Sequence, residues 1–310
     1  MILIVELDPI LEKIYCVNRL YSNTETIAES VENRLGGDGI ISARILNNLN
    51  LNVFTMGFLG GLNGQYIFDQ LKLYGIYNDF VSIKDESKSS ISLFENKRLF
   101  STIIEPGPRI TREELVWLYE VYNKVIDNHS IICSMGNIPI GVPDEIYYDL
   151  IDLANRRKKK FILDTTGRAL TRGIEAIPFM VKVDKHDLEN MSRLKLDFET
   201  EIIRVGRSVL EKGIEIVVID LDKDGTIVLT RDRGYRLELP DGDLNDINKD
   251  RGYLVSGYAF GIERQYDFET TMRLAQAMRI VYGLEEDVDK IDMGDIKGIM
   301  SRIEISSIYY

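Results

Sequence analysis

Short apolar runs alternate with segments of helical spacing along most of this 310-residue chain, and this alternation restricts the folds that it can adopt. The runs are rich in Ile, Leu and Val and are continuous, which is typical of strands buried on both faces of a parallel sheet. They lie within 1–5, 51–58, 131–139, 161–170, 179–188 and 215–229. Because repeated strand–helix units build parallel sheets, we predict an α/β fold with a central, mostly parallel sheet.

The composition excludes several classes of protein. Hydrophobic residues make up 45% of the chain, and its net charge of −12 argues against non-specific binding to nucleic acid or to an anionic membrane. No run approaches the roughly 20 apolar residues of a membrane span, and the run at 1–5 is too short for a signal-peptide core. Cys16 and Cys133 form no disulfide framework, and His129 and His186 are not spaced like metal ligands and are expected at the surface. We expect a cytoplasmic protein and assign no metal ligands.

A charged loop at 246–251 leads into a segment of small and apolar residues at 252–261. A loop that feeds the first turn of a buried helix brings backbone N–H groups and the helix dipole together, and this arrangement suits an anion. The small residues, among them Gly257, also suit close packing of a buried helix. Taken alone, the pattern favours packing over an anion site.

The same stretch resembles the late signature of the ribokinase-like (pfkB) carbohydrate kinases, a Gly-Ala-Gly-Asp loop followed by a small-residue helix with an Ala-Gly-Phe step. Ser256-Gly257-Tyr258 matches that step. Other similar stretches, in the family's order, are Leu7-Asp-Pro-Ile-Leu-Glu12, Gly36-Gly-Asp-Gly-Ile-Ile-Ser-Ala-Arg44, Gly57-Phe-Leu-Gly-Gly-Leu-Asn-Gly64, Glu105-Pro-Gly-Pro108 and Phe161-Ile-Leu-Asp-Thr-Thr-Gly167. The first of these resembles the tagatose-6-phosphate kinase and 1-phosphofructokinase branch, although the active-site motifs are degenerate.

The resemblance implies a three-layer ribokinase-like sandwich that spans 1–310 as a single domain. It also implies a small β lid built from segments near 12–34 and 86–104, which in the family covers the sugar and pairs two subunits. We therefore expect a sugar or sugar-phosphate ligand and a homodimer through the lid, with no nucleic-acid or membrane partner. The implied cofactors are ATP and Mg²⁺ if the protein is active, and none otherwise.

The substrate side departs from the family at charged positions. Glu12 stands where the family has an Asp that binds sugar hydroxyls, and Asp8 stands for an Asn. Gly36 and Gly37 are kept, but the following Lys, which touches the sugar phosphate in the family, is Asp38. A carboxylate where a phosphate should bind is repulsive.

Two further substrate motifs are altered. The family's Arg that grips the substrate phosphate aligns with Ser89, so Lys88 takes that role only after a slip of one residue. In the strand and turn at 131–139, Gly136 is kept and Asn137 replaces a serine. The resemblance still places these residues at the sugar.

At the positions that bind the nucleotide in the family, this chain has additional carboxylates. Lys182 is retained, but the Asn and Glu that organise nucleotide phosphates and Mg²⁺ in the family are Asp184 and Asp187. Their spacing fits one face of a helix, either as oxygen ligands for a hard cation or as a solvated first turn. The Ser and Gly beside the nucleotide are Asp220 and Asp222, which lower affinity for a triphosphate unless a cation intervenes.

The catalytic loop has changed most. Gly252 takes the position of the family's catalytic Asp, and Lys249, Asp250 and Arg251 take those of the anion-hole glycines. The loss of a general base alone costs about 10²–10⁴-fold in rate. The sequence therefore predicts a pfkB-like protein that is impaired or inactive in phosphotransfer.

Two alternatives remain open. The first is an active ATP-dependent kinase of tagatose 6-phosphate, fructose 1-phosphate or a related sugar. In it Asp250 is the substitute base, and Lys249 and Arg251 supply positive charge to the nucleotide. The second is an unphosphorylated, cationic ligand in the acidic pocket.

Overall fold

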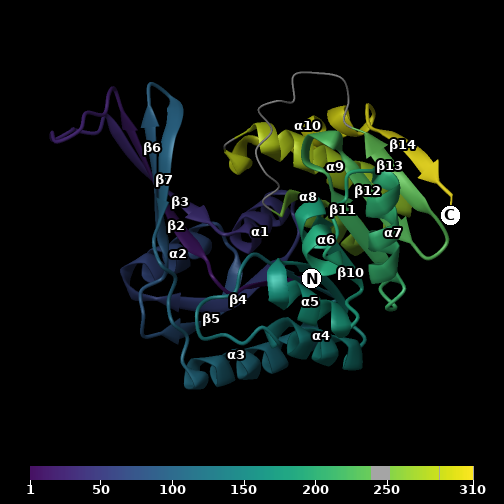
Figure 1. Cartoon of the computed structure of the whole chain (residues 1–310). Coiled ribbons are helices and arrows are strands. Elements are labelled where there is room, and N and C mark those ends of the chain that lie inside the picture. Colours follow the sequence, from purple (N-terminus) through teal and green to yellow (C-terminus); the bar gives the residue numbers. More distant parts are fainter. Residues whose placement is uncertain (239–251, 286, 310) are drawn as a thin grey trace.

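A ten-stranded, mostly parallel sheet forms the centre of the molecule (Figure 1). The computed structural model describes residues 1–238, 252–285 and 287–309. Seven neighbouring strands are parallel, and three strands extend the sheet in antiparallel fashion. In spatial order they are β14 (Glu304–Ile308), β13 (Gly234–Glu238), β12 (Thr226–Thr230), β11 (Ile216–Asp220), β10 (Met180–Asp184), β9 (Lys160–Asp164), β8 (Ile131–Met135), β1 (Ile2–Glu6), β4 (Val53–Gly60) and β5 (Tyr77–Ile83). The predicted parallel sheet is confirmed.

Helices cover both faces of this sheet, which makes three layers. One layer holds α1 (Asp38–Asn48), α2 (Gly61–Leu73), α8 (Tyr253–Glu263), α9 (Phe268–Leu284) and α10 (Met293–Met300). The other holds α3 (Arg112–Val125), α4 (Ile146–Arg156), α5 (Gly167–Glu175), α6 (Lys185–Ser192) and α7 (Glu199–Leu210). Since strand side chains alternate, Ile4 of β1 packs into the first layer and Val5 into the second. In the described ranges no helix has the length and apolar content to cross a membrane.

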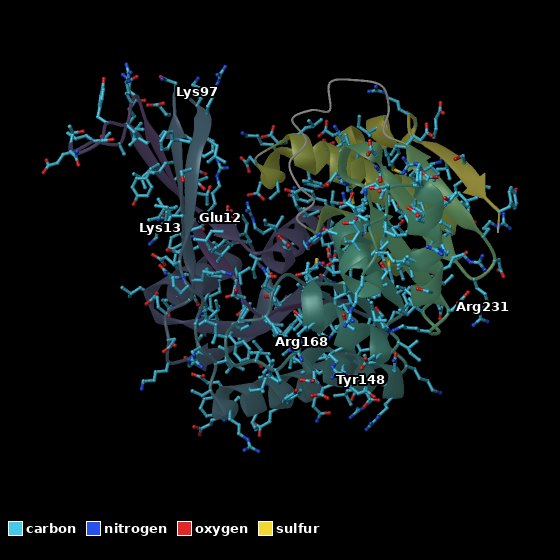
Figure 2. All side chains as sticks on the ribbon, viewed as in Figure 1. Glu12, Lys13, Lys97, Tyr148, Arg168 and Arg231 are labelled. Carbon is cyan, nitrogen blue, oxygen red and sulfur yellow. The ribbon has the colours of Figure 1, made fainter. Side chains whose placement is uncertain are left out.

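A second sheet of four strands projects from the main body (Figure 1). Its order is β3 (Ser30–Gly36), β2 (Ile10–Val17), β6 (Ser89–Glu95) and β7 (Arg98–Ile104). Figure 2 shows Glu12 on β2 nearer the main body and Lys97 at the far tip of the β6–β7 hairpin. The segments 12–34 and 86–104 lie largely in these strands, so this small sheet forms a wall beside the ends of the central strands.

The small residues of α8 serve close packing. A side chain at Gly257 would bring its Cβ within 2.3 Å of the Cα of Ala275 in α9, so the two helices approach at van der Waals distance only because this residue is glycine. The packing interpretation of this stretch is therefore correct at Gly257.

One histidine is not where the sequence placed it. His129, expected at the surface, is 2% exposed, and its Nδ1 lies 2.7 Å from the carbonyl oxygen of Val125. Its ring packs 5.4 Å from that of Phe54, and burial lowers the pKa of His129. The side chain completes the turn after α3 and is a core residue.

Candidate functional site

Two cavities lie at the edge of the sheet where the parallel strands end. The first, of about 420 Å³, lies beyond β1 and β8 and is walled by the small sheet. The second, of about 950 Å³, lies beyond β10 and β11. In open α/β sheets ligands bind beyond the carboxyl ends of the strands, so both cavities are candidate sites.

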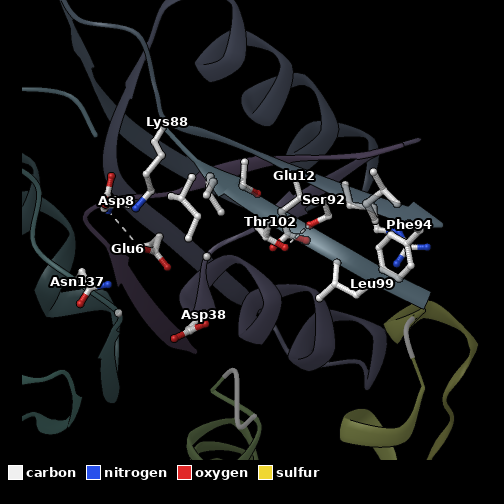
Figure 3. Close-up of a pocket in the computed structure, with 17 residues that line it drawn as sticks. Glu6, Asp8, Glu12, Asp38, Lys88, Ser92, Phe94, Leu99, Thr102 and Asn137 are labelled. Atoms are coloured by element: carbon white, nitrogen blue, oxygen red, sulfur yellow. Dashed lines mark hydrogen bonds and ion pairs between the residues drawn. The ribbon is translucent and has the colours of Figure 1, made fainter. Parts of the chain in front are cut away.

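The first cavity collects most of the predicted substrate residues (Figure 3). Six of them line it, namely Glu12, Gly37, Asp38, Lys88, Gly136 and Asn137. Gly36 does not line it but supports the wall, because a Cβ there would lie 2.7 Å from Cγ of Glu12. Among the lining residues, four carboxylates (Glu6, Asp8, Glu12, Asp38) face two cations (Arg34, Lys88). The cavity is acidic.

Glu6 is a site residue that the motifs did not single out. It ends β1, is 1% exposed and lines the cavity. Its Oε2 accepts a hydrogen bond of 2.7 Å from the backbone N–H of Gly39, in the first turn of α1, and its Oε1 accepts one of 3.2 Å from the N–H of Asp8. Burial, followed by the nearby Asp38 carboxylate, raises the pKa of Glu6 to about 8. The sequence signal that could have identified Glu6 is its position directly after the apolar run at 1–5.

Asp8 and Lys88 form an ion pair at one end of the cavity. Lys88 donates from Nζ to Oδ2 of Asp8, and their side chains are 15% and 8% exposed. Burial raises the pKa of Asp8 although Lys88 opposes the change. The Lys88 ammonium thus reaches the first cavity, but it already has an anionic partner there.

Gly252 lies next to the first cavity, at the N-terminus of α8. Its φ of 77° is in the left-handed region, and its carbonyl oxygen accepts a 3.1 Å hydrogen bond from Ser42 Oγ. A Cβ at this position would lie 2.6 Å from Ser42 Oγ, 2.8 Å from Met135 Sδ and 3.0 Å from the carbonyl oxygen of Asp38. The position therefore has neither the backbone conformation nor the room for an aspartate side chain.

The second cavity is more acidic than the first. Eight Asp and Glu residues line it against four Lys and Arg residues. Of the predicted nucleotide residues, Asp184, Asp220 and Asp222 line it, whereas Lys182 and Asp187 do not. The Lys182 ammonium lies 3.4 Å from Oδ1 of Asp164 on the neighbouring strand. The structure therefore gathers only part of the predicted nucleotide set around this cavity.

The Asp184–Asp187 pair begins α6 as a capping box. Asp184 Oδ1 accepts a 2.7 Å hydrogen bond from the N–H of Asp187, and Asp187 Oδ2 accepts one of 3.3 Å from the N–H of Asp184. Asp187 is 5% exposed, so a solvated first turn is wrong for it. Burial and the Asp184 carboxylate raise the pKa of Asp187. Each carboxylate thus accepts a hydrogen bond from a backbone N–H at the start of α6.

Asp220 forms a buried ion pair with Arg279 of α9. The two side chains are 5% and 2% exposed, and Nη2 of Arg279 lies 3.0 Å from Oδ1 of Asp220 and 4.0 Å from Oδ1 of Asp222. Arg279 was not predicted, although a charged residue between Met278 and Ile280 was a signal that it needed a buried partner. The pair fixes the end of β11 against α9.

The predicted loop residues Lys249, Asp250 and Arg251 lie outside the described ranges. The candidate site therefore rests on the strand ends, α1 and the start of α8.

A mostly parallel sheet between two helical layers, with cavities at the strand ends and a projecting small sheet, defines an α/β protein of the ribokinase-like kind. Residues 3–246 match the family model described as pfkB family carbohydrate kinase. The chain belongs to the pfkB family of carbohydrate kinases. The matched range ends just before the altered residues 249–252.

Several relatives agree with this assignment. A 1-phosphofructokinase of Borreliella burgdorferi is 25% identical over 275 residues, which cover 88% of each chain. Phosphofructokinase-2 of Escherichia coli in complex with potassium has a similar structure, with a TM-score of 0.88, 18% identity and coverage of 97% of this chain and 98% of that one. A tetrameric inhibited form of the same protein gives a TM-score of 0.85, with 18% identity and the same coverage. At this identity the two structures show the shared fold.

The raised pKa of Glu6 predicts a pH-dependent stability. The folded protein retains the Glu6 proton up to about pH 8, whereas an unfolded chain releases it near pH 4.5. Between these values ionisation favours the unfolded state, so stability should fall as pH rises, by up to about 1.4 kcal/mol per pH unit from this group. We expect Glu6→Gln to remove this component when urea unfolding is measured from pH 5 to pH 8. Equal slopes for the wild type and Glu6→Gln would contradict the assignment.

The Arg279–Asp220 pair predicts a large mutational effect. Arg279→Met leaves the Asp220 carboxylate buried without this cation, and breaking a buried pair in this way costs about 3–5 kcal/mol. Urea unfolding should show this loss. The matched control is Arg156→Met, which removes an exposed i,i+4 pair with Asp152 and should cost no more than about 0.5 kcal/mol. If both variants lost a similar free energy of unfolding, the Arg279–Asp220 pair would not be a major source of stability.

Proposed function

We propose that this pfkB-family protein binds a sugar-like ligand in the cavity beyond β1 and β8 and transfers phosphoryl groups weakly or not at all. The observation that carries the proposal is the packing at Gly252, the position of the family's catalytic Asp. A side chain there would meet Ser42, Met135 and the Asp38 carbonyl, in a backbone conformation that suits glycine.

The space that a base would need is filled by neighbouring groups. Ser42 Oγ donates to the Gly252 carbonyl and lies 3.2 Å from Met135 Sδ, and Met135 stands where the family has a serine. The loss of the Asp is thus accompanied by repacking of the residues around it. Because phosphoryl transfer depends on positioned groups around developing negative charge, this repacking supports impaired chemistry.

The charge of the second cavity supports the same proposal. Eight carboxylates against four cations disfavour a nucleotide triphosphate there. Asp220 is also committed to Arg279 and is therefore not a free ligand for Mg²⁺. ATP and Mg²⁺ would be cofactors only of an active enzyme.

The competing function comes from the relatives. Because the Borreliella burgdorferi relative is named 1-phosphofructokinase, an active kinase of fructose 1-phosphate or tagatose 6-phosphate is the alternative, with Asp250 as its base. An assay of turnover separates the two functions.

We expect ADP release with ATP·Mg²⁺ and either sugar phosphate to be at least about 10²-fold slower than that of the Borreliella burgdorferi 1-phosphofructokinase assayed alongside with fructose 1-phosphate. Gly252→Asp should not raise the rate, because the new side chain is strained and crowded. Gly252→Asp combined with Met135→Ser should be the more stable of the two variants, since the second change removes one of the clashing groups.

Asp250→Asn is the control for the alternative. Residual turnover should be unchanged by it. A rate comparable to that of the Borreliella burgdorferi enzyme, abolished by Asp250→Asn, would establish the active kinase and refute the proposal.

We also propose that residues 1–310 work as one ribokinase-like unit in which the small sheet is a lid and pairs two copies of the chain. The lid strand β7 is exposed along its whole length. Phe100 and Ile103 of β7 and Val31 of β3 are 62%, 54% and 54% exposed. Exposed apolar side chains of this kind mark association surfaces.

The dimer has a direct test. Light scattering coupled to size-exclusion chromatography should give twice the chain mass for the wild type, and the monomer mass for Phe100→Asp combined with Ile103→Asp, because charges in the interface lose their solvation. Leu194→Asp, an exposed apolar residue between α6 and α7, is the control and should remain dimeric. A monomeric wild type would refute the pairing.

A further inference from the structure

One oxygen of Asp8 indicates what the first cavity binds. Oδ2 is engaged by Lys88, but Oδ1 is buried and has no hydrogen-bond partner among the described residues. Asp8 is 9% exposed and lines the cavity, where Figure 3 shows it beside Lys88. A buried carboxylate oxygen accepts hydrogen bonds only and is costly when left without a donor. The Asp8 side chain, which lines the cavity, therefore carries an acceptor that the described residues do not use.

The same cavity is unfavourable for a phosphate group. The backbone N–H of Gly39, in the first turn of α1, is taken by Glu6 Oε2 and so is not offered to a phosphate. Of the lining cations, Lys88 pairs with Asp8, and Arg34 pairs with Glu32 at 2.6 and 2.9 Å. A phosphate would lie among carboxylates while its cations are held by other acids.

Hydroxyl and amide groups line the rest of the wall together with the apolar side chains of Ile10, Ile14, Phe94, Leu99 and Ile104. Ser90 and Ser92 of β6 and Thr102 of β7 contribute hydroxyls, and Asn137 contributes an amide. Ser92 Oγ and Thr102 Oγ1 lie 3.1 Å apart, so a ligand hydroxyl can exchange hydrogen bonds with either. Such a wall suits a polyhydroxylated molecule, and a volume of about 420 Å³ lies within the usual range for small-molecule sites.

We propose that the ligand of this cavity is an unphosphorylated, polyhydroxylated molecule that carries a primary ammonium group, of the amino-sugar class, with the ammonium donating to Oδ1 of Asp8. With Glu6 protonated, Asp8, Glu12 and Asp38 still outnumber Lys88 and Arg34 and attract the ligand, and the serine and threonine hydroxyls bind its hydroxyls. This inference rests on the proposed function in that it takes the cavity beyond β1 and β8 as the ligand site.

Two matched trios of compounds test the inference. Isothermal titration calorimetry of the full chain compares glucosamine, glucose and glucose 6-phosphate, and then 1-amino-1-deoxyfructose, fructose and fructose 1-phosphate. In at least one trio we expect the amine to bind about tenfold or more tighter than the neutral sugar, and the phosphate ester to bind more weakly than either. If in both trios the neutral sugar equals the amine, if the phosphate ester binds most tightly, or if nothing binds, the inference is overturned.

Variants assign the preference to Asp8. Asp8→Asn keeps the shape and removes the charge, so the preference for the amine over the neutral sugar should fall to about twofold or less. Because this change deprives Lys88 of its partner, the double variant Asp8→Asn with Lys88→Met is made as well. It leaves the net charge of the cavity unchanged and should lose the same preference. Asp144→Asn, at an ion pair with Arg168 outside the cavity lining, is the control and should keep it. Retention of the preference in both Asp8 variants would overturn the assignment.

A turnover assay separates this inference from the proposed function. If the amine binds as expected and is also phosphorylated rapidly with ATP·Mg²⁺, the ligand class stands and the proposal of impaired phosphotransfer fails. If the phosphate ester binds most tightly and no ADP is released, the ligand class fails and the proposal of impaired phosphotransfer stands.

Discussion

The carboxyl group of Glu6 joins strand β1 to the first helix, and one wall of the first cavity is built around that junction. One oxygen accepts a hydrogen bond from an amide of α1 and the other accepts one from the amide of Asp8, so the chain leaves β1 in a fixed direction. Close approach of backbone around Glu6 requires glycine, because a Cβ at Gly57 would lie 1.7 Å from the Glu6 carbonyl oxygen. This buried acid therefore stabilises the local fold while it also lines the cavity.

The altered positions are tightly packed or paired within the fold. Gly252 has no space for a side chain because Ser42 and Met135 pack against it, and Asp220 is the buried counter-ion of Arg279. These residues therefore contribute to the packing of the fold, which does not by itself define the chemistry of the cleft.

The mostly parallel α/β sheet could be predicted from the sequence because the signals for strands and helices are local. The run at 1–5 overlaps β1 and the run at 51–58 overlaps β4, since continuous apolar runs are typical of strands buried in a parallel sheet. The sequence did not predict the roles of Glu6 and Arg279. Glu6 contacts Gly39, 33 residues away, and Arg279 contacts Asp220, 59 residues away. The burial of His129 was missed for the same reason. Charged residues within apolar segments were visible, but their partners are set by tertiary packing.

The small sheet has a consequence for how the molecule assembles. Strands β2 and β6 pair in parallel with Leu11 opposite Ser89, and the intervening chain contributes α1, β4, α2 and β5 to the main body. Bringing such distant segments together costs a large loop-closure entropy before any hydrogen bonds between them form. The β2–β6 pairing should therefore be completed after the central strands have docked, so the wall that carries Glu12 becomes ordered late during folding.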